Sequence, residues 1–270
     1  PVKVVALEHD ISVYQPEKLS GSQELEALMQ LYADLIVTAA YGQFLPTKFL
    51  NFPRFSAVNV HASLLPKYRG GAPIHYAIMN GDKETGVTIM RMVAKMDAGA
   101  IISQRAIPIT GEDDVASMFE KLSVVGADLL IETLPALFAG TITEVEQDEA
   151  LVSFSPNISR EQEQIDWNKT ASEVDCFVRG LRPWPTSFTI LNGNRVKMWG
   201  VALTDKQTAK TPGSLFVEGG RLYVACGSGT VLEITRLQPA GKAQMDAKAF
   251  MNGFSELLKN DAIFEGLNHE

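Results

Sequence analysis

Hydrophobic and polar positions divide the chain into two parts with different periodicities. In the first part, a helical pattern with apolar residues at i, i+3, i+4 and i+7 covers Leu25, Leu28, Met29 and Tyr32. The nearly continuous apolar run Leu35–Ala40 predicts a strand buried on both faces, and Ala57–His61 predicts a central strand. Helices that alternate with such strands predict an α/β domain.

The same reasoning extends through the rest of the first part. Pro1–Glu8 resembles the end of a helix and Ile11–Tyr14 a short buried strand. Further helices are predicted at Pro46–Leu50, at Pro73–Met79 and along the apolar positions between Val115 and Leu137, and neighbouring strands at Thr85–Val93 and Ala100–Ile107.

A segment rich in acidic, Ser, Thr and Asn residues, from about Gly140 to Glu163, predicts a linker. After a helix at Thr170–Leu181 the pattern changes to short β-rich runs separated by turn residues, which is typical of a small barrel. The predicted strands are Thr186–Leu191, Arg195–Leu203, Gly213–Val217, Leu222–Cys226 and Thr230–Leu237. We therefore predict domains at 1–145 and 169–270, joined by a linker at 146–168.

Two polar side chains interrupt the central strand. Asn59 and His61 are two residues apart and so point to the same side. A turn with Pro66, Gly70 and Gly71 follows, and such a turn can hold backbone groups against a ligand. An isolated Asn-X-His is nevertheless more typical of a structural strand end, and a loop aspartate such as Asp97 more typical of a turn.

The wider pattern resembles the folate-dependent formyltransferases. The resemblance includes Asn59, His61, Ser63, Leu64, Leu65, Pro66, Arg69, Gly70, Thr85–Thr88, Asp97, Ile165–Trp167, Pro183–Pro185 and Leu237–Lys242. It covers essentially the whole chain, and its last block is most similar to the members that act on methionyl-tRNA.

This resemblance implies an incomplete Rossmann-like, doubly wound α/β domain followed by an OB-like β-barrel. It implies Asn59, His61 and Asp97 as catalytic residues and 10-formyltetrahydrofolate as formyl donor, with no metal. The donor would lie against Tyr41, Gly42, Gln43, Phe44 and Leu45 and against Ser63, Leu64, Leu65 and Pro66. From spacing alone, the loop at 41–46 could equally be a plain strand-to-helix turn.

The implied acceptor is the amino group of initiator methionyl-tRNA. In such a reaction Asn59 can donate to the formyl oxygen, His61 can transfer a proton, and Asp97 can orient His61 or relay a proton. The barrel would contact tRNA through Lys169, Arg179, Arg182, Arg195, Lys197 and Lys242, although each alone is more typical of a solvated surface, and Arg182 could be structural.

Composition and charge limit these possibilities. The 270 residues carry a net charge of −8, which argues against indiscriminate binding to nucleic acid. Residues 167–248, however, hold eleven basic and six acidic side chains. Two cysteines without metal-ligand spacing and no long membrane-spanning run predict a cytoplasmic protein without a membrane partner.

Two other functions stay open: an amino sugar nucleotide formyltransferase, which would not need a basic barrel, and a non-catalytic RNA-binding protein. The family also begins with a complete first βαβ unit and a basic loop, upstream of Pro1. We therefore expect this chain to be part of a longer, monomeric protein and to be poorly folded and inactive alone. Ile11–Tyr14 should then lie apart from the main sheet, and Leu35–Ala40 should have an unpaired edge.

Overall fold

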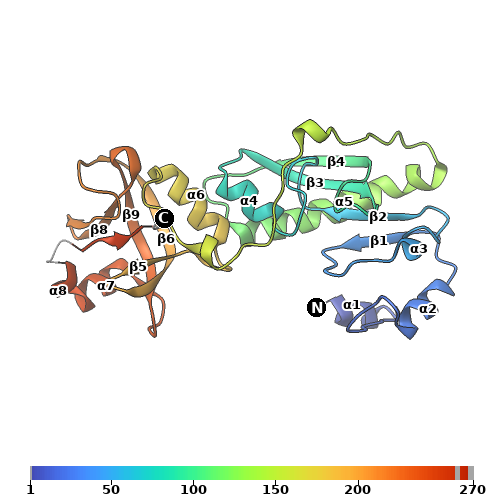
Figure 1. Ribbon diagram of the computed structural model, residues 1–270, viewed down its shortest axis with the longest axis horizontal. Helices are drawn as coiled ribbons and strands as arrows, with labels where there is room; N and C mark the ends of the chain where they lie inside the picture. The colour runs from blue at the N-terminus through green and yellow to red at the C-terminus, as the bar shows by residue number, and fades with distance from the viewer. Residues whose placement is uncertain (1, 259–261, 267–270) are drawn as a thin grey trace.

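The computed structural model describes residues 2–258 and 262–266 (Figure 1). An α/β unit lies at the right in Figure 1 and a β-rich unit at the left, with helices α4 (Pro73–Met79) and α6 (Ala171–Leu181) between them. The predicted fold class, α/β followed by a barrel-like sheet, is confirmed.

The α/β unit contains a four-stranded sheet. The strand order follows the chain: β1 (Ile36–Ala39), β2 (Ala57–His61), β3 (Glu84–Arg91) and β4 (Ile101–Pro108). The β1–β2 pair is parallel and the other two pairs are antiparallel. Since β1 and β2 are parallel, the loops after both strands emerge at the same end of the sheet.

Helix α5 (Val115–Ala139) covers one face of this sheet. Asp114 caps its N-terminus in a capping box with Ser117, and Gly140 ends it in a left-handed conformation. Gly126 lets it approach closely, since a Cβ there would lie 3.0 Å from Val60 Cγ1. By length and composition α5 could cross a membrane, but its buried side packs on the strands as a core helix.

Shorter helices complete the unit: α1 (Val2–Glu8), α2 (Gln23–Met29) and α3 (Thr47–Leu50). The apolar residues of α2, α3 and β1 form a separate small core with Leu19 and Leu45.

Two predictions about the start of the chain need correction. Ile11–Tyr14 forms no strand, and Ile11 is 59% exposed. β1 is not buried on both faces, because Val37 is 43% exposed and Ala39 is also exposed. As expected, Ile11–Tyr14 lies apart from the sheet, and β1 is its edge strand.

The segment from residue 141 to 163 packs closely against the α/β unit. Val145 pairs with Ile101, and Phe154 pairs with Arg69. Gln147 and Ser155 in this segment are buried. A polar sequence therefore does not make this segment a loose tether, although the proposed domain boundaries themselves stay a prediction.

The β-rich unit is a curled antiparallel sheet in the order β11-β5-β6-β9-β8-β7, with β10 paired to β9. Its strands are β5 (Phe188–Leu191), β6 (Asn194–Gln207), β7 (Leu215–Glu218), β8 (Arg221–Ala225), β9 (Thr230–Pro239), β10 (Met245–Asp246) and β11 (Phe264–Glu265). Helices α7 (Ala247–Gly253) and α8 (Ser255–Leu258) follow β10. Trp167, Phe250 and Phe264 are fully buried in its core.

The two edges of this sheet meet and close it. Ser214, just before β7, forms an antiparallel bridge with Ile263, just before β11. Leu215 N donates to Ala262 O at 2.8 Å, and Phe264 N donates to Gly213 O at 2.9 Å. Closure leaves no long unpaired edge at this seam.

Two arginines, one in the last turn of α6 and one directly after it, connect the two units. Arg179 Nη1 donates to the backbone oxygen of Asp113, and Arg182 Nε donates to Asp114 Oδ2, each at 2.8 Å. Both acceptors stand at the start of α5. The backbones of α4 and α6 also approach closely at Gly180, where a Cβ would lie 2.4 Å from Met79 Cγ and 2.9 Å from Met79 N.

The close contact between α4 and α6 at Gly180 leads to a prediction about stability. Gly180→Ala should destabilise the protein by about 1–3 kcal/mol, because the methyl group would force α4 and α6 apart. Gly253→Ala is the matched control, since Gly253 is also helical but has no atom within 4 Å of its Cβ position. Urea unfolding followed by circular dichroism would measure both; equal stability of the two variants would contradict the packing argument.

A second prediction concerns Asp113 at the start of α5. Burial of this carboxyl raises its pKa, but hydrogen bonds from Lys121, Thr110 and Ser117 outweigh that effect and hold the pKa well below its ordinary value near 3.8. Its ionised form therefore stabilises the fold above that value, and this contribution is lost as the pH falls toward the lowered pKa.

Asp113→Asn should accordingly be less stable than the unsubstituted protein at pH 7, with the difference shrinking as the pH falls below 4. Thermal unfolding across this pH range would measure it, with the exposed Asp10→Asn as control. A difference that is constant with pH would show that the carboxylate charge is not the cause.

Candidate functional site

The residues singled out in the sequence lie at the end of the sheet where β1 and β2 terminate. His61 is the last residue of β2, and the loop from Tyr41 to Leu45 follows β1. The turn after His61 returns to α4, and Asp97 lies in the connection between β3 and β4.

His61 is buried, with 6% of its surface exposed, and both ring nitrogens face oxygen atoms. Nε2 lies 3.0 Å from the backbone oxygen of Tyr68. Since a carbonyl can only accept, Nε2 must carry the hydrogen, and in the neutral ring Nδ1 has the lone pair. Nδ1 lies 3.8 Å from Asp97 Oδ2, which is slightly beyond hydrogen-bond length.

The backbone around Asp97 holds its carboxylate near the imidazole. Asp97 has a φ of 48°, in the left-handed region, which aspartate tolerates better than most residues. Its Oδ2 accepts a hydrogen bond from Gly70 N at 2.8 Å. The neighbouring Gly99 is required by space, because a Cβ there would lie 1.9 Å from Arg91 O.

Asn59 lies two residues before His61 on the same side of β2. Thr38 Oγ1 donates to Asn59 Oδ1 at 2.8 Å, which turns the oxygen toward β1. Over residues 2–258 and 262–266 no hydrogen bond engages Nδ2, and none joins Asn59 directly to His61 or Asp97. The structure therefore brings His61 and Asp97 together and leaves the Asn59 amide free to donate.

The loop after β1 contains both exposed and buried members of the predicted donor-binding set. Tyr41 and Phe44 are 46% and 74% exposed, and Gly42 is also exposed. Gln43 is engaged with an earlier segment, since Oε1 accepts from Leu19 N and Nε2 donates to Glu17 O. Leu45 is buried in the small core of α2 and α3. Tyr41 and Phe44 are thus the side chains open to a ligand.

Side chains of β3 and β4 hold the turn after β2 through hydrogen bonds. Ser63 is fully buried and donates through Oγ to Lys67 O, and Leu65 is also buried. Thr88 Oγ1 accepts from Leu65 N and donates to Ser63 O, while Gln104 Nε2 donates to Leu65 O. Leu64 and Pro66 are half-buried, so they are the members of this set that a ligand could contact.

Sequence reasoning missed the residues that support the site from the segment after α5. Gln147 Nε2 donates to the backbone oxygens of Asp97 and Gly99 at 2.8 and 2.9 Å. Its Oε1 accepts from Arg69 Nε at 3.0 Å. An isolated glutamine in an acidic, polar stretch gives no sequence signal for such a role.

Tyr68 lies in the same turn but has a structural role. Its φ is 64°, and its hydroxyl donates to Asp82 Oδ2 at 2.8 Å. Burial, with the Asp82 carboxylate, raises the Tyr68 pKa to about 12. The hydroxyl therefore stays protonated at neutral pH and is not available as a base.

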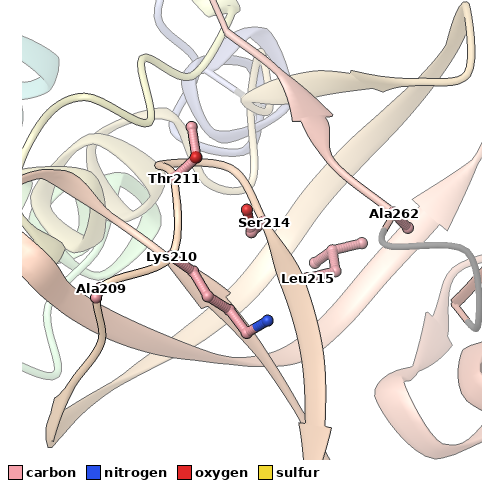
Figure 2. Close-up of a pocket in the computed structure, with 6 residues that line it drawn as sticks. All are labelled: Ala209, Lys210, Thr211, Ser214, Leu215 and Ala262. Carbon is pink, nitrogen blue, oxygen red and sulfur yellow. The ribbon is translucent and has the colours of Figure 1, made fainter.

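Two hollows lie away from this strand end. One, of about 260 Å³, adjoins the seam that closes the barrel, and Figure 2 shows Lys210, Thr211 and Ser214 around it with Leu215 and Ala262. The other, of about 480 Å³, lies between the two units beside Arg179 and Arg182. Neither contains an imidazole, and within the described ranges no cluster of His, Cys, Asp and Glu could hold a metal ion.

Comparison with known proteins agrees with this arrangement. The family model described as "Formyl transferase" matches residues 1–134, and that of "Formyl transferase, C-terminal domain" matches residues 157–255. Together they span both units of the structure.

Individual relatives are similar over nearly the whole chain. A methionyl-tRNA formyltransferase of Enterococcus faecalis is 60% identical over 95% of this chain and 82% of its own length. One from Levilactobacillus brevis is 57% identical over 96% of this chain and 82% of its own.

Among solved structures, an N-formyltransferase from Helicobacter canadensis has the same fold, with a TM-score of 0.66 at 19% identity, over 87% of this chain and 81% of its own. The resemblance predicted from the sequence is confirmed, and this chain belongs to the formyl transferase family.

Proposed function

We propose that this protein transfers a formyl group from 10-formyltetrahydrofolate to the amino group of initiator methionyl-tRNA. The observation that carries the chemistry is the contact of a buried imidazole with a carboxylate, at the strand end where the Asn59 amide is free to donate. The similarity to methionyl-tRNA formyltransferases at 60% and 57% identity supports the acceptor.

Asn59 is suited to stabilise negative charge on the formyl oxygen. Transfer to an amine passes through a tetrahedral arrangement in which this oxygen gains charge. With the amide oxygen against Thr38 Oγ1, Nδ2 is left to donate a hydrogen bond to that charge. Loss of one such donor typically lowers the rate on the order of 10²–10³-fold.

His61 and Asp97 are suited to move a proton from the attacking amine to the nitrogen whose bond to the formyl carbon breaks. With its hydrogen on Nε2, the neutral His61 ring can accept a proton at Nδ1. The carboxylate of Asp97, 3.8 Å away, would then face the positive ring and stabilise it. Because Gly70 N holds Oδ2, the carboxylate stays in place while the ring changes charge.

The donor is a folate in this proposal because the Helicobacter canadensis structure contains folinic acid, a folate derivative. The residues here fit such a group: Tyr41 and Phe44 offer exposed rings to a flat heterocycle, and Leu64 and Pro66 offer half-buried apolar surface beside His61. When bound, the folate supplies the activated formyl group, and the chain orients it.

The barrel offers a small basic surface for the acceptor. Of the six basic residues predicted to contact tRNA, four are already paired: Lys169 with Glu173, Arg179 with Asp175, Arg182 with Asp114 and Arg195 with Glu163. In the described part of the chain, Lys197 and Lys242 have no ion-pair partner.

Both of these lysines adjoin Gln238. Lys197 stands opposite Gln238 in the β6–β9 register, and Gln238 Nε2 donates to Lys242 O at 2.9 Å. Trp199 Nε1 donates to the same glutamine. Together they form a cationic surface with an adjacent aromatic ring, which suits a phosphate backbone. Translation is the setting of this reaction, so we place it in the cytoplasm.

The two alternative functions have weaker support. The Helicobacter canadensis protein, crystallised with dTDP-3-aminofucose, is only 19% identical. A non-catalytic RNA-binding function leaves the His61–Asp97 geometry unexplained. Formylation assays with initiator methionyl-tRNA and with dTDP-3-aminofucose as acceptors would distinguish all three. Formylation of the sugar alone, or of neither acceptor, would overturn the proposal.

His61→Gln should lower kcat for formyl transfer by about 10²–10⁴-fold. Glutamine can still donate an amide hydrogen to Tyr68 O, so the turn is preserved, but no base remains at the Nδ1 position. Formylated methionyl-tRNA would be quantified at saturating donor, with the exposed His9→Gln as matched control. Unchanged turnover in a folded His61→Gln variant would refute the role of His61.

The double variant Lys197→Gln, Lys242→Gln should bind tRNA more weakly and with a flatter salt dependence. Each lost phosphate contact should reduce the log–log salt slope by about 0.7–0.9. Lys206→Gln with Arg221→Gln is a control of equal charge change, because these side chains are paired with Glu218 and Glu233. Identical salt slopes for both double variants would argue against this surface.

A further inference from the structure

We infer that Gln147 is a positioning residue for formyl transfer: together with Arg69 it holds the loop that carries Asp97. The inference rests on the proposed function for its kinetic consequence. Gln147 lies in the segment between α5 and the barrel, fifty residues beyond Asp97, and is 8% exposed.

The amide of Gln147 satisfies two carbonyl groups of the Asp97 loop at once. Its two Nε2 hydrogens can serve the backbone oxygens of Asp97, at 2.8 Å, and Gly99, at 2.9 Å. These carbonyls flank Ala98, in a loop where Asp97 has a positive φ. An exchange of amide oxygen and nitrogen would set oxygen against two carbonyl oxygens, so only one orientation is stable.

Arg69 fixes that orientation from the other side. Its Nε donates to Gln147 Oε1 at 3.0 Å, and its side chain is 1% exposed. Its Nη2 pairs with Glu149 Oε1 at 3.0 Å, while Nη1 is buried without a partner in the described residues. The buried Arg69 guanidinium therefore donates its side-chain hydrogen bonds to Gln147 and Glu149.

Glu149 connects the cation to the loop a second time. Its Oε2 accepts from Lys95 Nζ at 2.9 Å, and Lys95 precedes Asp97 by two residues. Hydrogen bonds from Lys95 and from Arg69 lower the pKa of Glu149, so it remains ionised. The loop is thus tied to the segment at 147–149 both before and after Asp97.

The residue after Arg69 contacts the carboxylate directly. Gly70 N donates to Asp97 Oδ2 at 2.8 Å and so holds the side chain of Asp97 in position. Arg69 holds the backbone of Asp97 indirectly, because it donates to Gln147, which in turn donates to the Asp97 backbone oxygen. We call Arg69, Gln147 and Glu149 the loop clamp. If the clamp is lost, Asp97 should move relative to His61 without any change in the residues that contact substrate.

The decisive variant is Gln147→Glu. An ionised glutamate can still accept from Arg69 Nε and adds a charge partner for the buried guanidinium. It has no hydrogen for the carbonyls of Asp97 and Gly99 and would repel them. Gln147→Met, of similar length, removes all polar atoms and is the second variant. Asp148→Asn, next in sequence and exposed, is the matched control.

Both Gln147 variants should lower kcat by about 10- to 100-fold, because small displacements of a reacting group have effects of this size. The KM values for donor and for methionyl-tRNA should stay within about twofold, since neither variant changes a substrate contact. Asp148→Asn should leave kcat unchanged. A purely structural role would instead lower the active fraction in proportion to lost folding, with normal kcat for the folded remainder.

The Gly70 amide proton provides a readout that is independent of activity. Its hydrogen bond to the Asp97 carboxylate should place it downfield in the NMR spectrum, and both Gln147 variants should move it upfield and speed its exchange. Asp148→Asn should not. If the unsubstituted protein formylates no acceptor, the proposed function fails, whereas the Gly70 shift still tests the clamp. Wild-type kcat with an unchanged Gly70 resonance in the folded Gln147 variants would overturn the inference.

Discussion

A buried positive charge determines how the loops of the α/β unit are arranged. The Arg69 guanidinium is 1% exposed, and an uncompensated charge at such a position would cost several kcal/mol. The guanidinium therefore needs hydrogen-bond acceptors. Both of its side-chain acceptors, Gln147 and Glu149, lie in the segment after α5 and not on neighbouring strands. This requirement explains why a polar stretch that resembles a linker lies against the sheet.

Glycine makes that approach possible on the backbone side. Gly70 has a φ of 124°, and a Cβ there would lie 2.6 Å from Ser155 O. With that space free, Arg69 N donates to Ser153 O, and Ser155 N donates to Arg69 O at 2.7 Å. The same glycine offers its own N–H to Asp97, so one residue without a side chain serves both the packing of the segment and the geometry of the carboxylate.

Much of the fold could be predicted from the sequence because local signals and periodicity agree. Pro73 at the start of α4, the capping residues of α5 and α6, and the turns between barrel strands are all local features. The strand predicted at Ile11–Tyr14 was wrong because a segment of four residues is too short for its pattern to distinguish a buried strand from an exposed, irregular segment. The prediction that β1 is buried on both faces was wrong, because the sequence pattern does not show that β1 lies at the edge of the sheet.

The candidate site was predictable to the same extent. Asn59 and His61 stand out because polar residues in an apolar strand need a reason, whereas Asp97 needed the family resemblance. Gln147 could not be found in this way, since its role depends on a contact with a loop fifty residues earlier. The acidic partners of Arg182 and Arg195 could not be found either, because Asp114 and Glu163 are distant from them in the sequence and meet them only in the folded chain.

Closure of the barrel affects the order in which the protein can form during synthesis. The seam needs Ala262, Ile263 and Phe264, while the strands that they meet begin near Gly213. The sheet and helices of the α/β unit have no such dependence, so they can fold while the barrel is still being made. Until residue 264 leaves the ribosome, the edge of β7 lacks its partner, and Trp167 lacks the Phe264 ring that stacks on it with centroids 5.3 Å apart.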